Sequence, residues 1–159
     1  MQLKATIDSS VIIALGKLGY LKLVCRLFDK LIISESVLEE IRKDPVYTEI
    51  SELTKGELVE VAKGSKQELL NMLSSSLGKG ETETIVLAIE LEADFALLDD
   101  LKARKTGRRL KVKVMGTLAL LRVLLDLRLV NEKPEDLCGK LIAQGFWVDA
   151  ETCLKVLKE

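Results

Sequence analysis

The stretch LKATID, residues 3–8, decides the fold of this chain. It has the pattern of a short β-strand that ends at a carboxylate, Asp8, and it is followed by a helix-like segment over residues 11–28 and the apolar run Leu31-Ile32-Ile33. A strand, a helix and a second strand in this order are typical of a parallel sheet, because neighbouring parallel strands need a crossover connection. The opening of the chain therefore predicts an α/β fold.

The same alternation returns in the second half of the chain. The elements predicted there are a helix over 81–92, a strand over 95–98, a basic helix over about 101–109, a strand over 112–115 and a helix over about 118–127. Between the two halves, residues 46–76 are weakly patterned and predict short helices with a strand near 58–61. Crossovers are almost always right-handed. We therefore expect a three-layer α/β/α sandwich around a mainly parallel sheet of about five strands.

Local signals predict several helix boundaries. Ser34 or Ser36 caps a helix that runs to about Lys43, and Asp44-Pro45 ends it because a residue before proline is pushed out of helical geometry. A C-terminal extension over 134–159 predicts two further helices separated by residues 145–148. With 159 residues, 48% of them hydrophobic, the chain is predicted to form one domain over residues 1–159.

Composition narrows the classes of protein. A net charge of −1 excludes a polycation. Cys25, Cys138 and Cys153 are far apart and odd in number, and without histidine they predict buried free thiols instead of a zinc site. Asp8 interrupts the N-terminal apolar run, which argues against a signal peptide, and charged residues break the apolar segment 112–130, which excludes a membrane span. These features predict a cytoplasmic protein.

Acidic residues recur where the predicted strands and helices meet. Asp8 follows the first strand, Asp99 and Asp100 follow the strand over 95–98, and Glu40 and Glu81 lie in helices. Ligands of open α/β sheets collect at the carboxyl ends of the strands. Two carboxylates about 4 Å apart repel by about 4 kcal/mol at an effective dielectric near 20, so a cluster of ionised acids needs a cation. The pattern predicts a divalent-metal pocket.

Helical geometry indicates which acids point inward. At about 100° per residue, Glu81 lies on the side of Ile85 and faces the sheet, whereas Glu83 lies opposite and is predicted to face water. In the preceding helix, Glu40 lies nearer the apolar face than Glu39 does. Glu40 and Glu81 are therefore the predicted site residues.

Each acid also has a purely structural explanation. Glu81 in a first helical turn is stabilised by the helix dipole, and Glu39 can pair with Lys43 four residues later. Asp8 and Asp99 can cap helices. The coincidence of several acids at the strand ends is what favours the functional interpretation.

Four acidic segments resemble, in order, the motifs of the PIN-domain superfamily. They are Ile7-Asp8-Ser9-Ser10, Val37-Leu38-Glu39-Glu40, Gly80-Glu81-Thr82-Glu83-Thr84-Ile85 and Leu97-Leu98-Asp99-Asp100. With the later Val114-Met115-Gly116-Thr117, they look most similar to a small stand-alone prokaryotic branch that includes toxin ribonucleases of the VapC type. The resemblance covers about residues 3–127.

The resemblance implies a PIN-like fold with a carboxylate cluster that binds Mg²⁺ or Mn²⁺ and cleaves single-stranded RNA. Asp8, Glu40 and Glu81 match the first three acids of the family, and either Asp99 or Asp100 matches the fourth. The family often has Thr or Ser just ahead of the fourth acid, where this chain has Leu98. The resemblance also implies an antitoxin protein as a partner and a homodimer, in which Trp147 or the tail helix is a candidate contact.

Basic residues follow the acidic pair directly. Lys102, Arg104, Lys105 and Arg108 predict a contact with a phosphate backbone beside the metal, and the alternative is a solvated helix face. Two rival functions stay open at this point. One is a phospho-receiver domain that uses an aspartate as phosphoacceptor, and the other is a PIN fold that has lost catalysis and serves as a binding scaffold.

Overall fold

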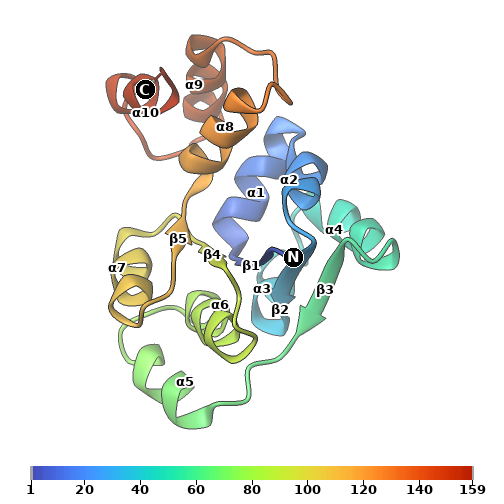
Figure 1. Ribbon diagram of the computed structural model, residues 1–159, viewed down its shortest axis with the longest axis vertical. Helices are drawn as coiled ribbons and strands as arrows, with labels where there is room; N and C mark the ends of the chain where they lie inside the picture. Colours follow the sequence, from blue (N-terminus) through green and yellow to red (C-terminus); the bar gives the residue numbers. More distant parts are fainter. Residues whose placement is uncertain (1, 159) are drawn as a thin grey trace.

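The computed structural model describes residues 2–158 and confirms the α/β/α sandwich (Figure 1). All strand pairs are parallel, and the sheet order is β3-β2-β1-β4-β5. The strands are β1 (Lys4–Ile7), β2 (Lys30–Ser34), β3 (Val59–Ala62), β4 (Phe95–Leu97) and β5 (Val114–Met115). The strand near residue 58, which had the weakest sequence signal, forms one edge of the sheet.

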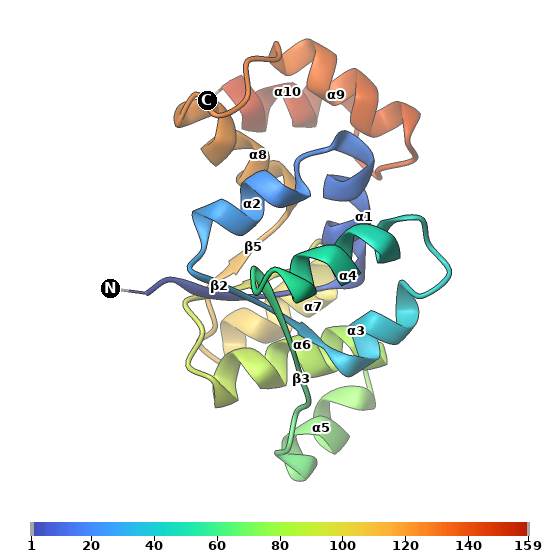
Figure 2. The same cartoon turned by 90° about the vertical axis from the view of Figure 1, so that its right-hand side faces the viewer.

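Helices cover both faces of the sheet, as Figure 2 shows. One face carries α1 (Ser9–Leu18), α2 (Leu21–Leu27), α4 (Val46–Lys55) and α8 (Thr117–Asp126). The other face carries α5 (Gln67–Ser74), α6 (Lys79–Glu90) and α7 (Leu101–Arg109). The short α3 (Glu35–Glu40) follows β2 and packs against α6, while α9 (Pro134–Ala143) and α10 (Ala150–Lys158) form an outer pair beside α8 and α1.

The core has two parts, one on each face of the sheet. Ala5 and Ile7 of β1 and Leu97 of β4 belong to the larger part, under α1, α2 and α8. Thr6 points to the other face, where its Oγ1 donates a hydrogen bond to the Thr84 carbonyl oxygen of α6 at 3.0 Å. This alternation is what a strand covered on both sides requires.

Two predicted helices end earlier than expected. The segment 11–28 forms two helices, α1 and α2, because the chain turns at Gly19, which has a positive φ of 80°. Ser34 caps α3 through a 3.0 Å bond from the Val37 N–H, but α3 ends at Glu40 and not at Lys43. The Asp44-Pro45 pair opens α4 instead, since Asp44 Oδ1 accepts a hydrogen bond from the Val46 N–H.

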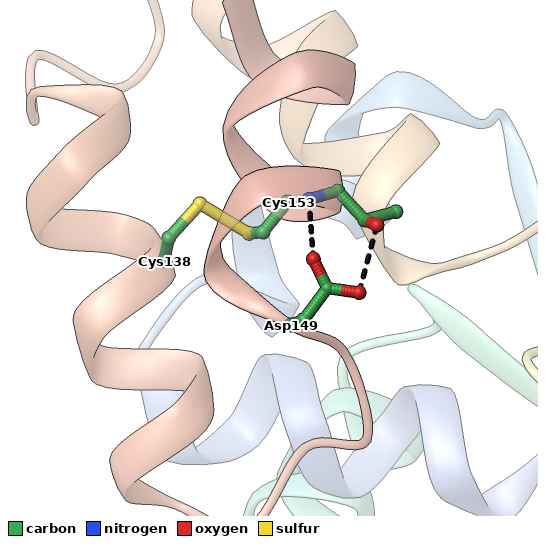
Figure 3. The surroundings of a disulfide bond; sticks show 4 residues. Cys138, Asp149 and Cys153 are labelled. Atoms are coloured by element: carbon green, nitrogen blue, oxygen red, sulfur yellow. Dashed lines mark hydrogen bonds between the residues drawn. A yellow bond between two sulfur atoms is a disulfide. The ribbon is translucent and has the colours of Figure 1, made fainter.

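The prediction of three free thiols is wrong for two of the cysteines. Cys138 of α9 and Cys153 of α10 form a disulfide, with their Cα atoms 5.9 Å apart (Figure 3). In the same view, the Asp149 carboxylate accepts hydrogen bonds from the N–H and hydroxyl of Thr152 and caps α10. Cys25 remains a buried free thiol, and burial raises its pKa to about 12. The expectation of a cytoplasmic protein rested in part on three free thiols. Because two of them form a disulfide, that support is lost.

The strongly apolar helix α8 serves the core. Leu120, Leu121 and Leu124 are fully buried, and α10, α1 and α2 pack against this helix. Within residues 2–158, every helix is too short or too polar to traverse a lipid bilayer.

The disulfide predicts a stability that depends on redox conditions. Closing a loop over a sequence separation of 15 residues restricts the unfolded chain, so the Cys138→Ser, Cys153→Ser double variant should lose about 3 kcal/mol of unfolding free energy. Urea unfolding followed by circular dichroism, with and without dithiothreitol, measures this loss. Dithiothreitol should lower the stability of the wild type and leave the double variant unchanged. If dithiothreitol does not change the stability of the wild type, the Cys138–Cys153 disulfide is contradicted.

Candidate functional site

The topology creates a crevice at the carboxyl ends of β1 and β4. The chain leaves β1 toward β2 on one side, and β4 later returns to the other side of β1. Such a switch point opens a crevice in which α/β proteins bind ligands. A cavity of about 860 Å³ lies there, and all five predicted acids line it, Asp8, Glu40, Glu81, Asp99 and Asp100. The tertiary structure therefore brings together residues that are up to 92 positions apart in the chain.

Asp8 forms the buried end of the cavity. Its residue is only 4% exposed, and its backbone N–H donates a 3.0 Å hydrogen bond to the Leu97 carbonyl oxygen, which fixes it against β4. It occupies the N-cap position of α1, but its side chain makes no capping bond, and Oδ1 has no hydrogen-bond partner. A buried carboxylate oxygen without a donor is costly, so this atom calls for a proton or a cation.

The environment of Asp8 raises its pKa from 3.8 to about 7. Burial is the largest cause, and the negative charges of Glu40, Glu81 and Asp99 add to it. A hydrogen bond from the Ser9 backbone lowers the pKa of Asp8 in part. The carboxyl therefore keeps its proton until near neutral pH.

Asp99 lies beside Asp8 and is held by the start of α8. Thr117 donates two hydrogen bonds to it, from its N–H at 2.7 Å and from its hydroxyl at 2.6 Å. Burial raises the pKa of Asp99, while the Thr117 bonds and the charge of Arg104 lower it. An added Cβ at Gly116 would lie 2.9 Å from Asp99 Oδ1, so only glycine lets the backbone come this close.

Asp100 and Glu81 lie nearer the mouth. Asp100 is exposed and caps α7, accepting a hydrogen bond from the Ala103 N–H at 2.9 Å. Glu81 Oε1 accepts a bond from the Gly78 N–H at 3.2 Å, so it also stabilises the start of α6. Burial raises the pKa of Glu81 most, and the nearby Asp100 charge raises it further. Both residues thus have a structural role and still line the cavity.

Glu40 reaches the cavity from the end of α3. Ser9 donates a 2.7 Å hydrogen bond from its hydroxyl to Glu40 Oε2, and Gly80 gives the carboxylate room. Glu39 points elsewhere and pairs with Arg42 at 3.0 Å, not with Lys43. The choice of Glu40 over Glu39 as the cavity residue agrees with this placement.

Glu83 corrects the helical-wheel argument. It was expected to face water, yet its residue is only 7% exposed and its carboxylate accepts hydrogen bonds from the N–H groups of Ser36 at 3.1 Å and Gly64 at 3.3 Å. The prediction is wrong because α6 has no fully wet side. It is covered by the sheet, by α3 and by α5. Glu83 therefore fastens α6 to the segments that follow β2 and β3.

The predicted basic contacts divide into two groups. Lys102, Lys105 and Arg108 are exposed on α7 and do not line the cavity. Arg104 is partly buried, its charge acts on Asp99, and its Nε has no hydrogen-bond partner. The cation that lines the cavity is Lys17 of α1, which had no distinguishing sequence signal.

One part of the cavity wall was not predicted from the sequence. It is formed by Leu141 and by the segment Gln144–Trp147, which lies between α9 and α10. Gln144 Nε2 donates to the Lys17 carbonyl oxygen at 3.2 Å, and Lys17 Nζ donates to the Gln144 carbonyl oxygen at 3.4 Å. Thr117 was also missed as a site residue, although Gly116-Thr117 directly after a strand was a visible signal.

The donor set suits a hard divalent cation. The five acids offer only oxygen ligands, which Mg²⁺ and Mn²⁺ prefer, and the orphaned Oδ1 of Asp8 supplies a buried acceptor. Within residues 2–158, however, no three Asp, Glu or Cys side chains are drawn together in the geometry of a finished metal site. Mutual repulsion of the carboxylates accounts for this open arrangement.

The raised pKa of Asp8 predicts how stability depends on pH in metal-free buffer. Between pH 3.8 and about pH 7 the folded state keeps a proton that the unfolded chain has lost, so the free energy of unfolding falls as pH rises through this window. Asp8→Asn removes this penalty and should gain at most about 4 kcal/mol at pH 8, with no gain near pH 4. Urea unfolding at a series of pH values in EDTA measures the difference. An equal loss of stability at every pH would contradict it and make Asp8 a structural residue.

Comparison with known proteins agrees with this architecture. The family DUF3368, described as a PIN domain, matches residues 4–159. Among solved structures, the chain resembles a PilT N-terminus domain protein from the hyperthermophilic archaeon Sulfolobus solfataricus P2, with a TM-score of 0.53 and 18% sequence identity, over 82% of this chain and 98% of that one. At this identity the likeness shows the fold alone. No curated protein matches the chain. The family match spans nearly the whole sequence, and the chain belongs to the PIN domain family.

Proposed function

We propose that this protein is a metal-dependent endoribonuclease that hydrolyses phosphodiester bonds of single-stranded RNA in the acidic cavity. PIN domains are generally nucleases. The observation that carries the proposal is the buried, unpartnered Oδ1 of Asp8 at the end of a cavity lined by four further carboxylates. A fold that used these acids only as helix caps would not leave one oxygen of the most buried acid without a donor.

The residues that would hold Mg²⁺ or Mn²⁺ are Asp8 and Asp99 at the buried end, with Glu40, Glu81 and Asp100 toward the mouth. When bound, such an ion supplies positive charge that activates water and the phosphodiester for hydrolysis. Thr117 orients Asp99 through two hydrogen bonds, and Ser9 orients Glu40. Both acids are therefore positioned before any ligand arrives.

Glu81 is suited to exchange a proton during the reaction. Burial and the Asp100 charge raise its pKa, and it lies at the cavity wall where substrate and water enter. A carboxyl whose pKa is raised by its surroundings holds a proton more readily than a free glutamate does, which suits a general acid or base. Asp99 is held in place by two hydrogen bonds from Thr117, and burial raises its pKa as well.

The charge distribution gives the RNA two contact regions. Lys17 lines the cavity itself, while Lys102, Lys105 and Arg108 lie exposed on α7, the helix that Asp100 caps. Because the net charge is only −1, attraction of a phosphate backbone depends on such local groups. Arg104 is partly buried and its charge acts on Asp99, so it is less free to contact the strand.

The proposal extends to partners on the strength of the resemblance to VapC-type toxins. We propose an antitoxin protein that inhibits the nuclease, and a homodimer that places two acidic sites in one groove. A neighbouring short reading frame that encodes a DNA-binding protein would support the first. Light scattering that returns a monomer mass would contradict the second.

The sheet order argues against one of the two rival functions and is compatible with the other. Receiver domains have the sheet order 2-1-3-4-5, with β1 next to β3, whereas here β1 pairs with β2 and β4. The phospho-receiver interpretation is therefore disfavoured by topology. An inactive PIN scaffold would keep this topology, and only a cleavage assay separates it from the nuclease.

Removing single acids should abolish cleavage. Asp8→Asn and Glu81→Gln should each lower the Mn²⁺-dependent cleavage rate by about 100-fold or more, because each variant loses a charge that the ion or the proton transfer needs. The assay follows a labelled single-stranded RNA with Mn²⁺ and, in parallel, with a chelator. Glu40→Gln is a further test, and Glu39→Gln is its matched control, since Glu39 pairs with Arg42 outside the cavity.

The outcome also separates the nuclease from the scaffold. Loss in Glu40→Gln with full activity in Glu39→Gln supports the site. If the wild type binds RNA but does not cleave it with any divalent ion, the protein is an inactive binding scaffold and not a nuclease.

Gly80 offers a test of Glu40 that changes no charge. A Cβ at Gly80 would lie 2.2 Å from Glu40 Oε1, so Gly80→Ala should displace this flexible carboxylate with little loss of stability. We expect about tenfold weaker Mn²⁺ binding by titration calorimetry, as found when groups that orient metal ligands are removed. Gly139→Ala in α9 is the control, because nothing lies within 4 Å of its added Cβ. Equal Mn²⁺ affinity in both variants would show that Glu40 is no ligand.

A further inference from the structure

Trp147 is the single tryptophan of the chain, and its side chain is fully exposed. It lies in the segment between α9 and α10 and lines the same cavity as the five acids. A large indole left wholly in water forgoes the stabilisation that burial gives other aromatic residues. Phe28 and Phe95, by comparison, stack edge to face at 6.2 Å.

The segment that carries Trp147 is tied down on both sides. Gln144 exchanges two hydrogen bonds with Lys17 of α1, and Gly145 turns the chain with a φ of 88°. Phe146 packs against the larger core cluster, and its N–H donates to the Leu141 carbonyl oxygen at 2.9 Å. The exposure of Trp147 is therefore a feature of an anchored turn and not of a frayed end.

The helices on either side of this turn are themselves fastened together. The Cys138–Cys153 disulfide joins α9 to α10, and Asp149 caps α10 only two residues after Trp147. The indole thus stands on a turn that is held on both sides and that lines the same cavity as the acids. The cavity lining therefore combines five carboxylates with an exposed aromatic side chain.

This pairing matches the two chemistries of a nucleotide. A phosphate needs the cation that the acids would hold, and a base offers a flat π-face for stacking. We propose that Trp147 stacks on an unpaired base of the RNA strand and so positions the adjoining phosphodiester at the acidic site. The inference rests on the proposed nuclease function and deepens it.

Stacking also gives a reason for preferring a single strand. A base inside a duplex has both faces covered by its neighbours, whereas an unpaired base can turn out onto an aromatic side chain. Every base has a π-face, so Trp147 adds affinity without selecting a sequence. It is a binding and positioning residue, not a catalytic one.

The experiment uses the full chain carrying Asp8→Asn, which should bind RNA without cutting it, in the presence of Mn²⁺. Tryptophan emission is followed while a single-stranded oligoribonucleotide is added, and RNA binding is measured in parallel by anisotropy of a label on the strand. Because the chain has one tryptophan, every change in emission comes from Trp147. A matched oligonucleotide with abasic positions supplies the same phosphates without bases.

We expect emission to change with the base-containing strand and not with the abasic one. Trp147→Ala on the same background should bind RNA about tenfold more weakly, and Trp147→Phe should recover part of the loss. Leu127→Ala is the control, since Leu127 is an exposed apolar residue that does not line the cavity. Circular dichroism of each variant checks that folding is unchanged.

Three results would overturn the inference. RNA that binds by anisotropy while Trp147 emission and the affinity of Trp147→Ala stay unchanged would remove Trp147 from the site and leave the nuclease proposal standing. Emission that depends on protein concentration and not on RNA would place Trp147 in a contact between two copies of the chain. Absence of both RNA binding by Asp8→Asn and cleavage by the wild type would defeat the nuclease proposal and this inference together.

Discussion

The burial of the Asp8 carboxylate at the end of β1 is the constraint on which the site depends. Its backbone is fixed to β4 through Leu97, so the side chain must enter the crevice between the two strands. One of its oxygens finds no donor there, and three other acids add their negative charge. The protein tolerates this because a cation, or a proton below neutral pH, can satisfy what the fold leaves open.

The remaining acids differ in how firmly the fold holds them. Thr117 holds Asp99 by hydrogen bonds. Asp100 and Glu81 also stabilise the starts of α7 and α6, respectively. Glu40, at the end of α3, receives one hydrogen bond from Ser9. Asp99 thus receives two of these hydrogen bonds, and each of the other three acids receives one.

The C-terminal helices complete the cavity as well as extend the fold. The motif resemblance ended near residue 127, yet the family match runs to residue 159, and the turn between α9 and α10 supplies part of the cavity wall. The disulfide and the Gln144–Lys17 bonds hold this wall against α1. The predicted C-terminal helical extension therefore contributes residues to the cavity.

The sequence by itself determined the alternation of strands and helices, the parallel sheet and the five acids that line the cavity, because period, turn residues and the carboxyl ends of strands are local signals. It could not determine that Glu83 is buried, since a helical wheel assumes one wet face and α6 is covered by the sheet, α3 and α5. Nor could it pair Cys138 with Cys153, bring Thr117 to Asp99, or place Lys17 and Trp147 at the cavity. Those relations join residues that are distant in the chain, and only the packing of helices against both faces of the sheet decides which of them meet.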